Sequence, residues 1–365
     1  MPMNSGNARA ASRLQTLPPA YFALVMATGI VSITSLLHGL DGLARGLFAL
    51  NLAQYAILWG LLILRFARFR ANVVADLGDH LRGPGFFTIV AATGVLSAQC
   101  FLVAHWPAVG TGLAFFTMLL WMLFVYAVFA LLIIKPRKPA FEKGINGGWL
   151  VAIVATQSVA LSATLAGTHL GGTEPMLLIV GLLAWSFGVM FYIWVISLIF
   201  YRYMFFGFEP GDLSPPYWIN MGAVAISTLA GCRLIGVAGG HPLLGELQPF
   251  IKGIVMILWS TATWWIPMLL ILGFWRHVVR AFPFKYDPLY WGMVFPVGMY
   301  SACTRLLARE LNLPFVSPIA WVFLALGIGV WAIVFYGMLR DIGPVVRGVL
   351  RGAALAPSAV EGDKG

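Results

Sequence analysis

The chain has 365 residues, of which 60% are hydrophobic and only 10% are charged, and its formal net charge is +10. A soluble domain carries about 25% charged residues, so this chain has too few to build a water-facing surface. The composition therefore excludes a soluble protein and predicts an all-α integral membrane protein. The only stretches typical of free chain in water are the ends, residues 1–16 and 341–365, with a membrane domain over 17–340 between them.

Ten apolar runs are long enough to cross a bilayer, which takes about 20 residues of helix. They lie at 18–37, 46–66, 86–104, 112–134, 149–168, 175–200, 217–237, 250–273, 289–307 and 316–338. An even number of crossings places both ends of the chain on one side. Eighteen of the 23 lysines and arginines lie on that side, so it is expected to be the cytoplasmic face of the cell membrane. The positive charge thus reflects topology and contact with membrane lipids, and it gives no indication of nucleic acid binding.

A local pattern recurs at the start of every odd-numbered run. Helix breakers Pro19, Pro84, Gly147, Pro215 and Pro288 are followed two and three residues later by large apolar side chains, mostly aromatic pairs. "PPAYFALVMATG" at 18–29 and "DPLYWGMVFPVG" at 287–298 are examples. Proline suits the first turn of a helix, and aromatic rings suit the membrane interface. The repeat therefore predicts a two-helix hairpin used five times in parallel orientation.

The odd-numbered runs are also more polar than the even-numbered ones. They contain 19 Ser, Thr, Asn and Gln, against nine in the even runs. Polar side chains are costly in hydrocarbon, so the odd helices are expected inside, around a central pore, and the even helices outside. The alternative is that these hydroxyls join helices to one another.

Counting from each breaker gives the residues that share a depth in the membrane. The predicted pore-lining residues near the middle are small for the most part: Met26, Ala27, Thr28, Ala91, Ala92, Thr93, Val154, Ala155, Thr156, Gly222 and Ala223. The ninth run instead places Phe295 at this depth, followed by Pro296. Proline removes a helical hydrogen bond and clashes with the carbonyl of Gly292, which predicts a kink that re-aims the phenylalanine ring.

The charged residues favour an anion as the permeant species. No Asp or Glu lies within a predicted span, whereas Arg233 and Arg305 lie near the outer ends of two odd helices and form a candidate anion vestibule. Interfacial snorkelling is the alternative for each arginine. His38, His105, His169 and His241 follow odd helices on the outer side; they are either a pH-sensing rim or ordinary loop residues.

No signature of an enzyme, a metal site or a bound cofactor is found. GxSxG and HExxH are missing, no histidine lies in a span, and Cys100, Cys232 and Cys303 are dispersed in apolar runs. A non-enzymatic transport protein without cofactor is expected.

The hairpin repeat, "PPAYFALVMATG" and "YWGMVFPVGMY" resemble the family of TehA, malate permeases and slow-type plant anion channels. The resemblance covers about residues 17–340 and implies ten helices in quasi-five-fold hairpins, a trimer, and one central pore per protomer gated by Phe295. It also implies passage of chloride, nitrate, C4-dicarboxylates such as malate, sulfite or oxyanions related to tellurite resistance. A passive channel and a proton-coupled dicarboxylate or sulfite exporter both remain open.

Overall fold

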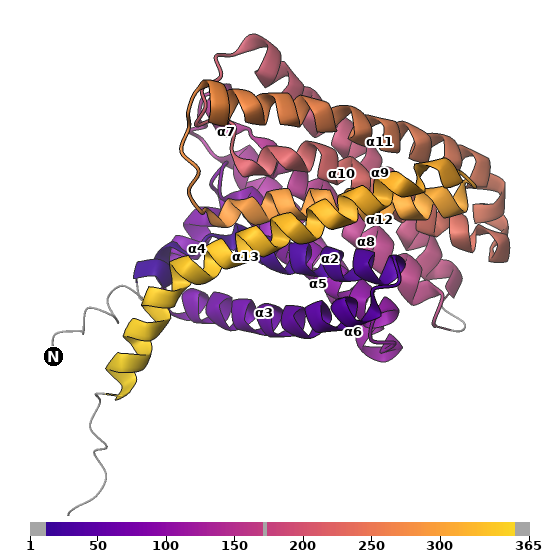
Figure 1. Ribbon diagram of the computed structural model, residues 1–365, viewed down its shortest axis with the longest axis horizontal. Helices are drawn as coiled ribbons and strands as arrows, with labels where there is room; N and C mark the ends of the chain where they lie inside the picture. Colours follow the sequence, from indigo (N-terminus) through magenta and orange to yellow (C-terminus); the bar gives the residue numbers. More distant parts are fainter. Residues whose placement is uncertain (1–11, 171–173, 355–365) are drawn as a thin grey trace, which may run out of the picture.

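The computed structural model describes residues 12–170 and 174–354, and its architecture is a barrel of helical hairpins (Figure 1). The inner helices are α2 (Ala23–Leu37), α5 (Phe87–Leu102), α8 (Val151–Gly167), α10 (Ile219–Val237) and α12 (Trp291–Glu310). The outer helices are α3 (Asp41–Arg68), α6 (Pro107–Ile134), α9 (Glu174–Phe205), α11 (Pro242–Phe274) and α13 (Ser317–Ala354). Each inner helix packs on the outer helix that follows it, and the inner helices contact one another in the closed order α2–α5–α8–α10–α12–α2.

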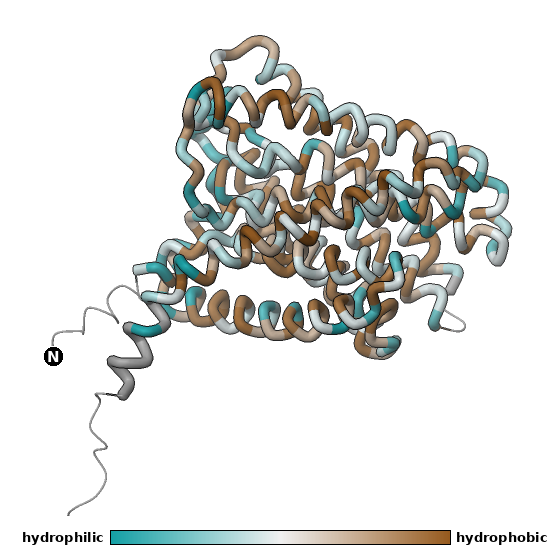
Figure 2. The backbone as a smooth tube through the Cα atoms, viewed as in Figure 1, coloured by the Kyte–Doolittle hydropathy of each residue, from teal (hydrophilic) through white to brown (hydrophobic). Residues whose placement is uncertain are grey.

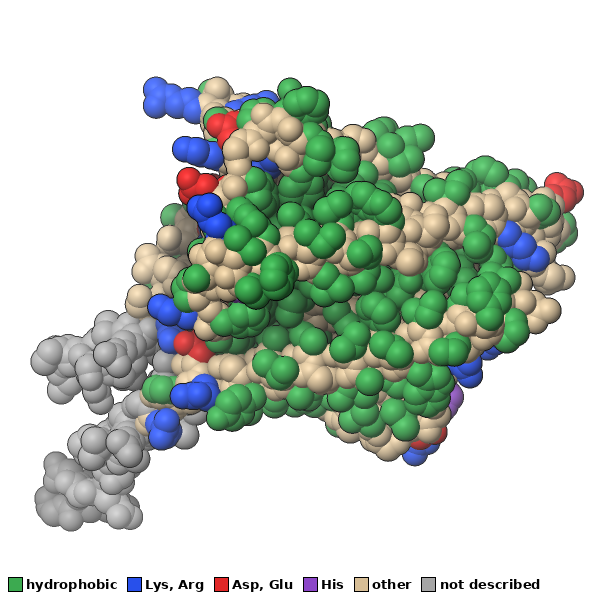
Figure 3. All heavy atoms as spheres, turned by 45° about the horizontal axis from the view of Figure 1, so that its top comes forward, with side chains coloured by type: hydrophobic (Ala, Val, Ile, Leu, Met, Phe, Trp, Pro, Cys, Tyr) green, Lys and Arg blue, Asp and Glu red, His purple; other side chains and the backbone are tan. Residues whose placement is uncertain are grey.

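Burial separates the two rings as the sequence predicts. The spans built on α2, α5, α8 and α10 are 78–100% buried, whereas those of the outer helices are 22–39% buried. Nine helices of the described part are long and apolar enough to cross a membrane. The tenth expected span, α12, is not among them, but it has 20 residues and is enclosed by the other helices, so its surface need not match lipid. Figure 2 shows apolar residues along the lengths of the helices, and Figure 3 shows a wide apolar belt with charged side chains gathered at its two ends.

Each breaker lies at the first or second position of a short 3₁₀ turn that leads into its inner helix. These turns are η1 (Pro19–Phe22), η2 (Gly83–Phe86), η3 (Gly147–Leu150), η4 (Pro215–Trp218) and η7 (Pro288–Tyr290). Proline's fixed φ and missing N–H fit the first turn of a helix, where the N–H has no intrahelical acceptor. The repeat found in the sequence is therefore the repeat of the fold.

The inner helices approach one another at small residues. A Cβ atom built on Gly29 would lie 2.5 Å from Val95 of the next inner helix, and one on Gly94 would lie 2.7 Å from Ser158. At Gly222 the same construction meets the ring of Pro296 at 2.6 Å. Only glycine permits this approach, so the ring closes around a narrow axis.

Polar groups tie the two rings together in a pattern that also repeats. Tyr55 meets Thr93 at 2.9 Å, Trp121 donates to Thr156 at 2.8 Å, and Trp331 donates to Thr28 at 3.0 Å. All three threonines lie nine residues after their breakers. The other two outer helices make comparable bonds, Trp185 to the Ser227 carbonyl and Trp259 to Thr304.

Serines thirteen residues after a breaker complete this pattern within the hairpins. Ser32, Ser97 and Ser301 donate to carbonyls of their own outer helices, each at 2.7 Å. The larger number of polar residues in the odd-numbered runs thus identified the inner helices correctly. Many of these hydroxyls nevertheless join one helix to another, which was the alternative explanation for their number.

The ends of the chain differ in part from the expected free tails. Residues 12–16 are helical, and α13 continues beyond residue 341 to Ala354 (Figure 1). Arg13 and Asp341 form an ion pair at 2.9 Å, so both ends of the described chain lie on the same side, as the even number of crossings predicts. The outer helices also begin or end several residues beyond the predicted spans, because a helix need not stop where the apolar run stops.

Replacing Gly222 with alanine should destabilise the ring, because the added methyl group lies within contact distance of Pro296. We expect a loss of roughly 1–3 kcal/mol of stability, as for overpacking in other well-packed cores. Thermal unfolding in detergent measures it. Gly253→Ala is the matched control, since its Cβ meets nothing within 4 Å and the change should be neutral or stabilising. Equal effects of the two substitutions would contradict the close packing.

Candidate functional site: an axial cavity beneath Phe295

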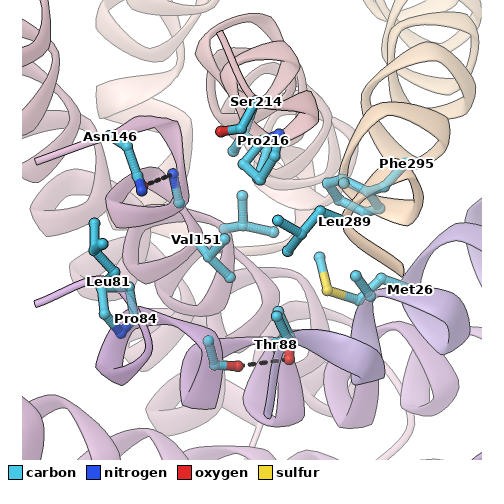
Figure 4. Close-up of a pocket in the computed structure, with 17 residues that line it drawn as sticks. Met26, Leu81, Pro84, Thr88, Asn146, Val151, Ser214, Pro216, Leu289 and Phe295 are labelled. Atoms are coloured by element: carbon cyan, nitrogen blue, oxygen red, sulfur yellow. Dashed lines mark hydrogen bonds between the residues drawn. The ribbon is translucent and has the colours of Figure 1, made fainter. Parts of the chain in front are cut away.

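A cavity of about 80 Å³ lies on the axis of the inner ring, at the end where the inner helices begin (Figure 4). It is lined by equivalent positions of all five helices. One residue after the breakers come Ala20, Gly85, Gly148, Pro216 and Leu289; four residues after them come Ala23, Thr88, Val151, Ile219 and Gly292. Successive lining positions are three residues apart and lie on one face of a helix, so residues equally far from their breakers line the cavity at one depth.

The cavity ends at the seventh position after the breakers. There the lining consists of Met26, Val154 and Phe295, from three different helices. Phe295 is 1% exposed, Met26 is 2% exposed and Val154 is fully buried. Three apolar side chains therefore meet at one depth on the axis, and Figure 4 shows Met26 and Phe295 beside Leu289 and Val151.

The other predicted pore residues near this depth are buried but have different surroundings. Ala27, Ala91, Ala92, Ala155 and Ala223 are fully buried within the ring. The space left by Gly222 is occupied by Pro296, so the proline packs helix against helix directly beside the phenylalanine. The hydroxyls of Thr28, Thr93 and Thr156 meet outer-ring side chains, as described above.

A wider cavity of about 660 Å³ adjoins the first one at the same end of the molecule. The two share Ala20, Leu81, Asn146, Ser214 and Leu289. Its charged lining residues are three cations, Arg82, Lys143 and Arg202, and three carboxylates, Glu142, Asp212 and Asp287. We call this cavity the inner vestibule.

Most of these charges are already engaged by protein groups. Arg82 pairs with Asp76 at 2.6 Å, Arg202 lies 3.5 Å from Asp212, and Arg202 donates to the Glu142 carbonyl at 2.6 Å. The vestibule residues were missed at the sequence level because most of them lie between an outer helix and the next breaker, where no periodic pattern marks them; Arg202 lies at the end of α9. Two of these residues could have been found from the sequence, because Asn and Asp directly before a breaker are typical helix caps. Asn146 and Asp287 do cap the first turns of η3 and η7.

The opposite end of the ring carries the predicted arginines and histidines. Arg233 on α10 is half-buried, and its Nε has no hydrogen-bond partner in the described part of the chain. Arg305 on α12 reaches the Leu37 carbonyl at 3.4 Å, and Arg309 pairs with Glu310 at 2.8 Å.

The histidines differ in exposure. His38 is 7% exposed and meets the Thr34 carbonyl through Nδ1 at 2.8 Å, whereas His105 and His169 are exposed and His241 is half-buried. Burial lowers the pKa of His38; the Thr34 carbonyl acts in the opposite direction, and the Arg305 cation lowers the pKa further.

A ten-helix barrel with an axial cavity of this kind defines a membrane transport protein. The chain belongs to the voltage-dependent anion channel family, which matches residues 16–339. It is 26% identical to an uncharacterized transporter of Methanocaldococcus jannaschii over 92% of this chain and 96% of the relative. A second uncharacterized transporter of that organism is 23% identical over 93% and 98%. An uncharacterized membrane protein of Mycobacterium tuberculosis is 35% identical over 42% of this chain and 78% of the relative.

His38 should be neutral at pH 7, because its pKa lies below the ordinary histidine value near 6.5. We therefore expect His38→Gln to leave anion currents at neutral external pH unchanged. A difference from the wild type should appear only as the pH falls below the ordinary histidine pKa of 6.5, where the protonated ring adds positive charge. Whole-cell currents against external pH test this, with exposed His105→Gln for comparison. A change already present at pH 7.5 would contradict a neutral His38.

Proposed function

We propose that the chain carries small anions passively across the cell membrane along the axis of the inner ring, with Phe295 as the gate. The observation that carries the proposal is the axial cavity that ends at Phe295, Met26 and Val154. An apolar constriction of this kind excludes ions because they cannot keep their hydration shells there. Chloride, nitrate, malate and other C4-dicarboxylates, and sulfite are the proposed substrates.

Helix polarity supports an anion over a cation. All five inner helices start at the vestibule end, so the positive ends of their dipoles converge there, each equivalent to about half an elementary charge. Asp287 accepts from the Leu289 N–H at one of these ends, as expected where a negative group is stabilised. At the far end Arg233 and Arg305 add positive charge where an anion would leave or enter.

Passage without proton coupling is the simpler proposal. The inner helices carry no carboxylate along the axial cavity, whose lining residues are apolar, small or hydroxyl-bearing apart from the amide of Asn146. A carboxylate in the membrane is the usual proton carrier in coupled transport. Anion flux into liposomes driven by voltage alone, without a pH gradient, separates passive passage from proton-coupled export.

Truncating the gate should open the axis without unfolding the protein. Phe295→Ala removes the largest side chain at the constriction, and we expect anion currents to rise on the order of tenfold. Currents, expression level and thermal stability are to be measured together. An unstable Phe295→Ala protein with no gain in current would show that the ring serves packing alone.

The matched control is Phe87→Ala. Phe87 is also 1% exposed, but it stacks on Phe129 with ring centroids 5.7 Å apart and lies outside the cavity lining. Its truncation should cost about 3–5 kcal/mol of stability and give no gain in current.

The positive-inside bias favours a cytoplasmic position for the vestibule end, and cysteine accessibility tests this orientation. Lys138 and Glu246 are exposed and lie on opposite sides of the predicted topology. The native cysteines are fully buried and should not react. An impermeant thiol reagent added outside cells should label Glu246→Cys and spare Lys138→Cys. The reverse labelling would invert the orientation.

A further inference from the structure

A separate cavity of about 150 Å³ lies at the vestibule end, where η4, the end of α11 and the start of α12 meet. Leu269 and Gly273 of α11 and Met293 of α12 border its apolar part. Arg276, His277 and Tyr290 border its polar part. It shares Ser214 with the axial cavity and the vestibule, but none of the other residues just named lines either of them. We call it the Arg276 cavity.

A π-helical turn sets the position of the arginine. The end of α11 changes to a π-helix over Trp275–Val279, a form that is rare and frequent at functional sites. The guanidinium of Arg276 is 4.3 Å from the centroid of the Phe282 ring, and one of its nitrogens donates to the Leu213 carbonyl. Arg276 is only 9% exposed, and its Nε has no partner in the described part of the chain.

The charge around this cavity is positive. Within residues 12–170 and 174–354, none of the ion pairs involves Arg276. Asp287 is close enough to act on it electrostatically, but this carboxylate caps the Leu289 N–H. Arg280 and Lys285 lie exposed on the same end of the molecule. A buried, partly unpartnered guanidinium in such surroundings favours an anionic ligand, and phosphate suits its geometry.

We propose that the Arg276 cavity binds the phosphate of an anionic phospholipid. The cavity lies at the end of the α11 span, at the level where lipid headgroups meet a membrane protein. Its volume is several times the ~30 Å³ share of one water molecule, which is room for a phosphate group, while the acyl chains lie along the outer face of α11. Leu269, Gly273 and Met293 provide the apolar floor beneath the headgroup.

Native mass spectrometry of the full chain in detergent tests the proposal with three probes: phosphatidylglycerol, phosphatidylcholine and inorganic phosphate. We expect phosphatidylglycerol to bind about tenfold more tightly than phosphatidylcholine. Both lipids carry the phosphate, but the choline cation of the second is repelled by the Arg276 guanidinium. Arg276→Gln should abolish this preference. Gly273→Leu should also abolish it while leaving the arginine in place, because a Cβ on Gly273 meets nothing within 4 Å and the longer side chain fills the cavity.

Arg68→Gln is the matched control, since Arg68 is an exposed arginine at the end of α3, and it should leave the preference unchanged. A phosphatidylglycerol preference that survives both Arg276→Gln and Gly273→Leu in folded protein would overturn the site. Equal binding of the two lipids by the wild type would overturn it as well. Displacement of lipid by millimolar inorganic phosphate, with no preference between the lipids, would assign the cavity to soluble phosphate and refute a lipid ligand.

Discussion

The close approach of five inner helices is the constraint on which the rest of the structure depends. Glycines such as Gly94 and Gly222 let side chains of the next inner helix reach within 2.6–2.7 Å of the place a Cβ would occupy. Because the helices are this close, the axis between them is narrow, and a single phenylalanine with two aliphatic neighbours is enough to end the cavity. The same packing explains why the hydroxyls of Thr28 and Thr156 point away from the axis. The axis has little room for them, and tryptophans of the outer helices donate hydrogen bonds to them.

Helix direction links this packing to function. All inner helices run the same way, so their positive ends meet at one vestibule while arginines occupy the other end. The five hairpins therefore produce both a closed ring and convergent positive helix ends at one end of its axis, which favour anions. The family of the chain agrees with that electrostatic reading.

Much of this architecture could be predicted from the sequence because the breakers fix depth. Proline at the first turn is a local signal, and counting from each breaker places Met26, Val154 and Phe295 at one level, which is where the axial cavity ends. The sequence could not predict that the Thr28 side chain contacts Trp331, or that Pro296 packs against Gly222. Both contacts depend on which helices are neighbours in the fold. The vestibule and the Arg276 cavity were missed for a related reason, since loops and a π-helical turn leave no periodic signal.

The central claim is that Phe295 separates the vestibule side of the axis from the rest, and thiol accessibility along α10 tests it most directly. Ile219 lines the axial cavity, and Ile226, seven residues on and fully buried, lies on the same helix face beyond the constriction. With a reagent applied from the vestibule side, Ile219→Cys should react and Ile226→Cys should be protected. Adding Phe295→Ala should make Ile226→Cys reactive. Reaction of Ile226→Cys with Phe295 in place, or protection that persists without it, would contradict the account.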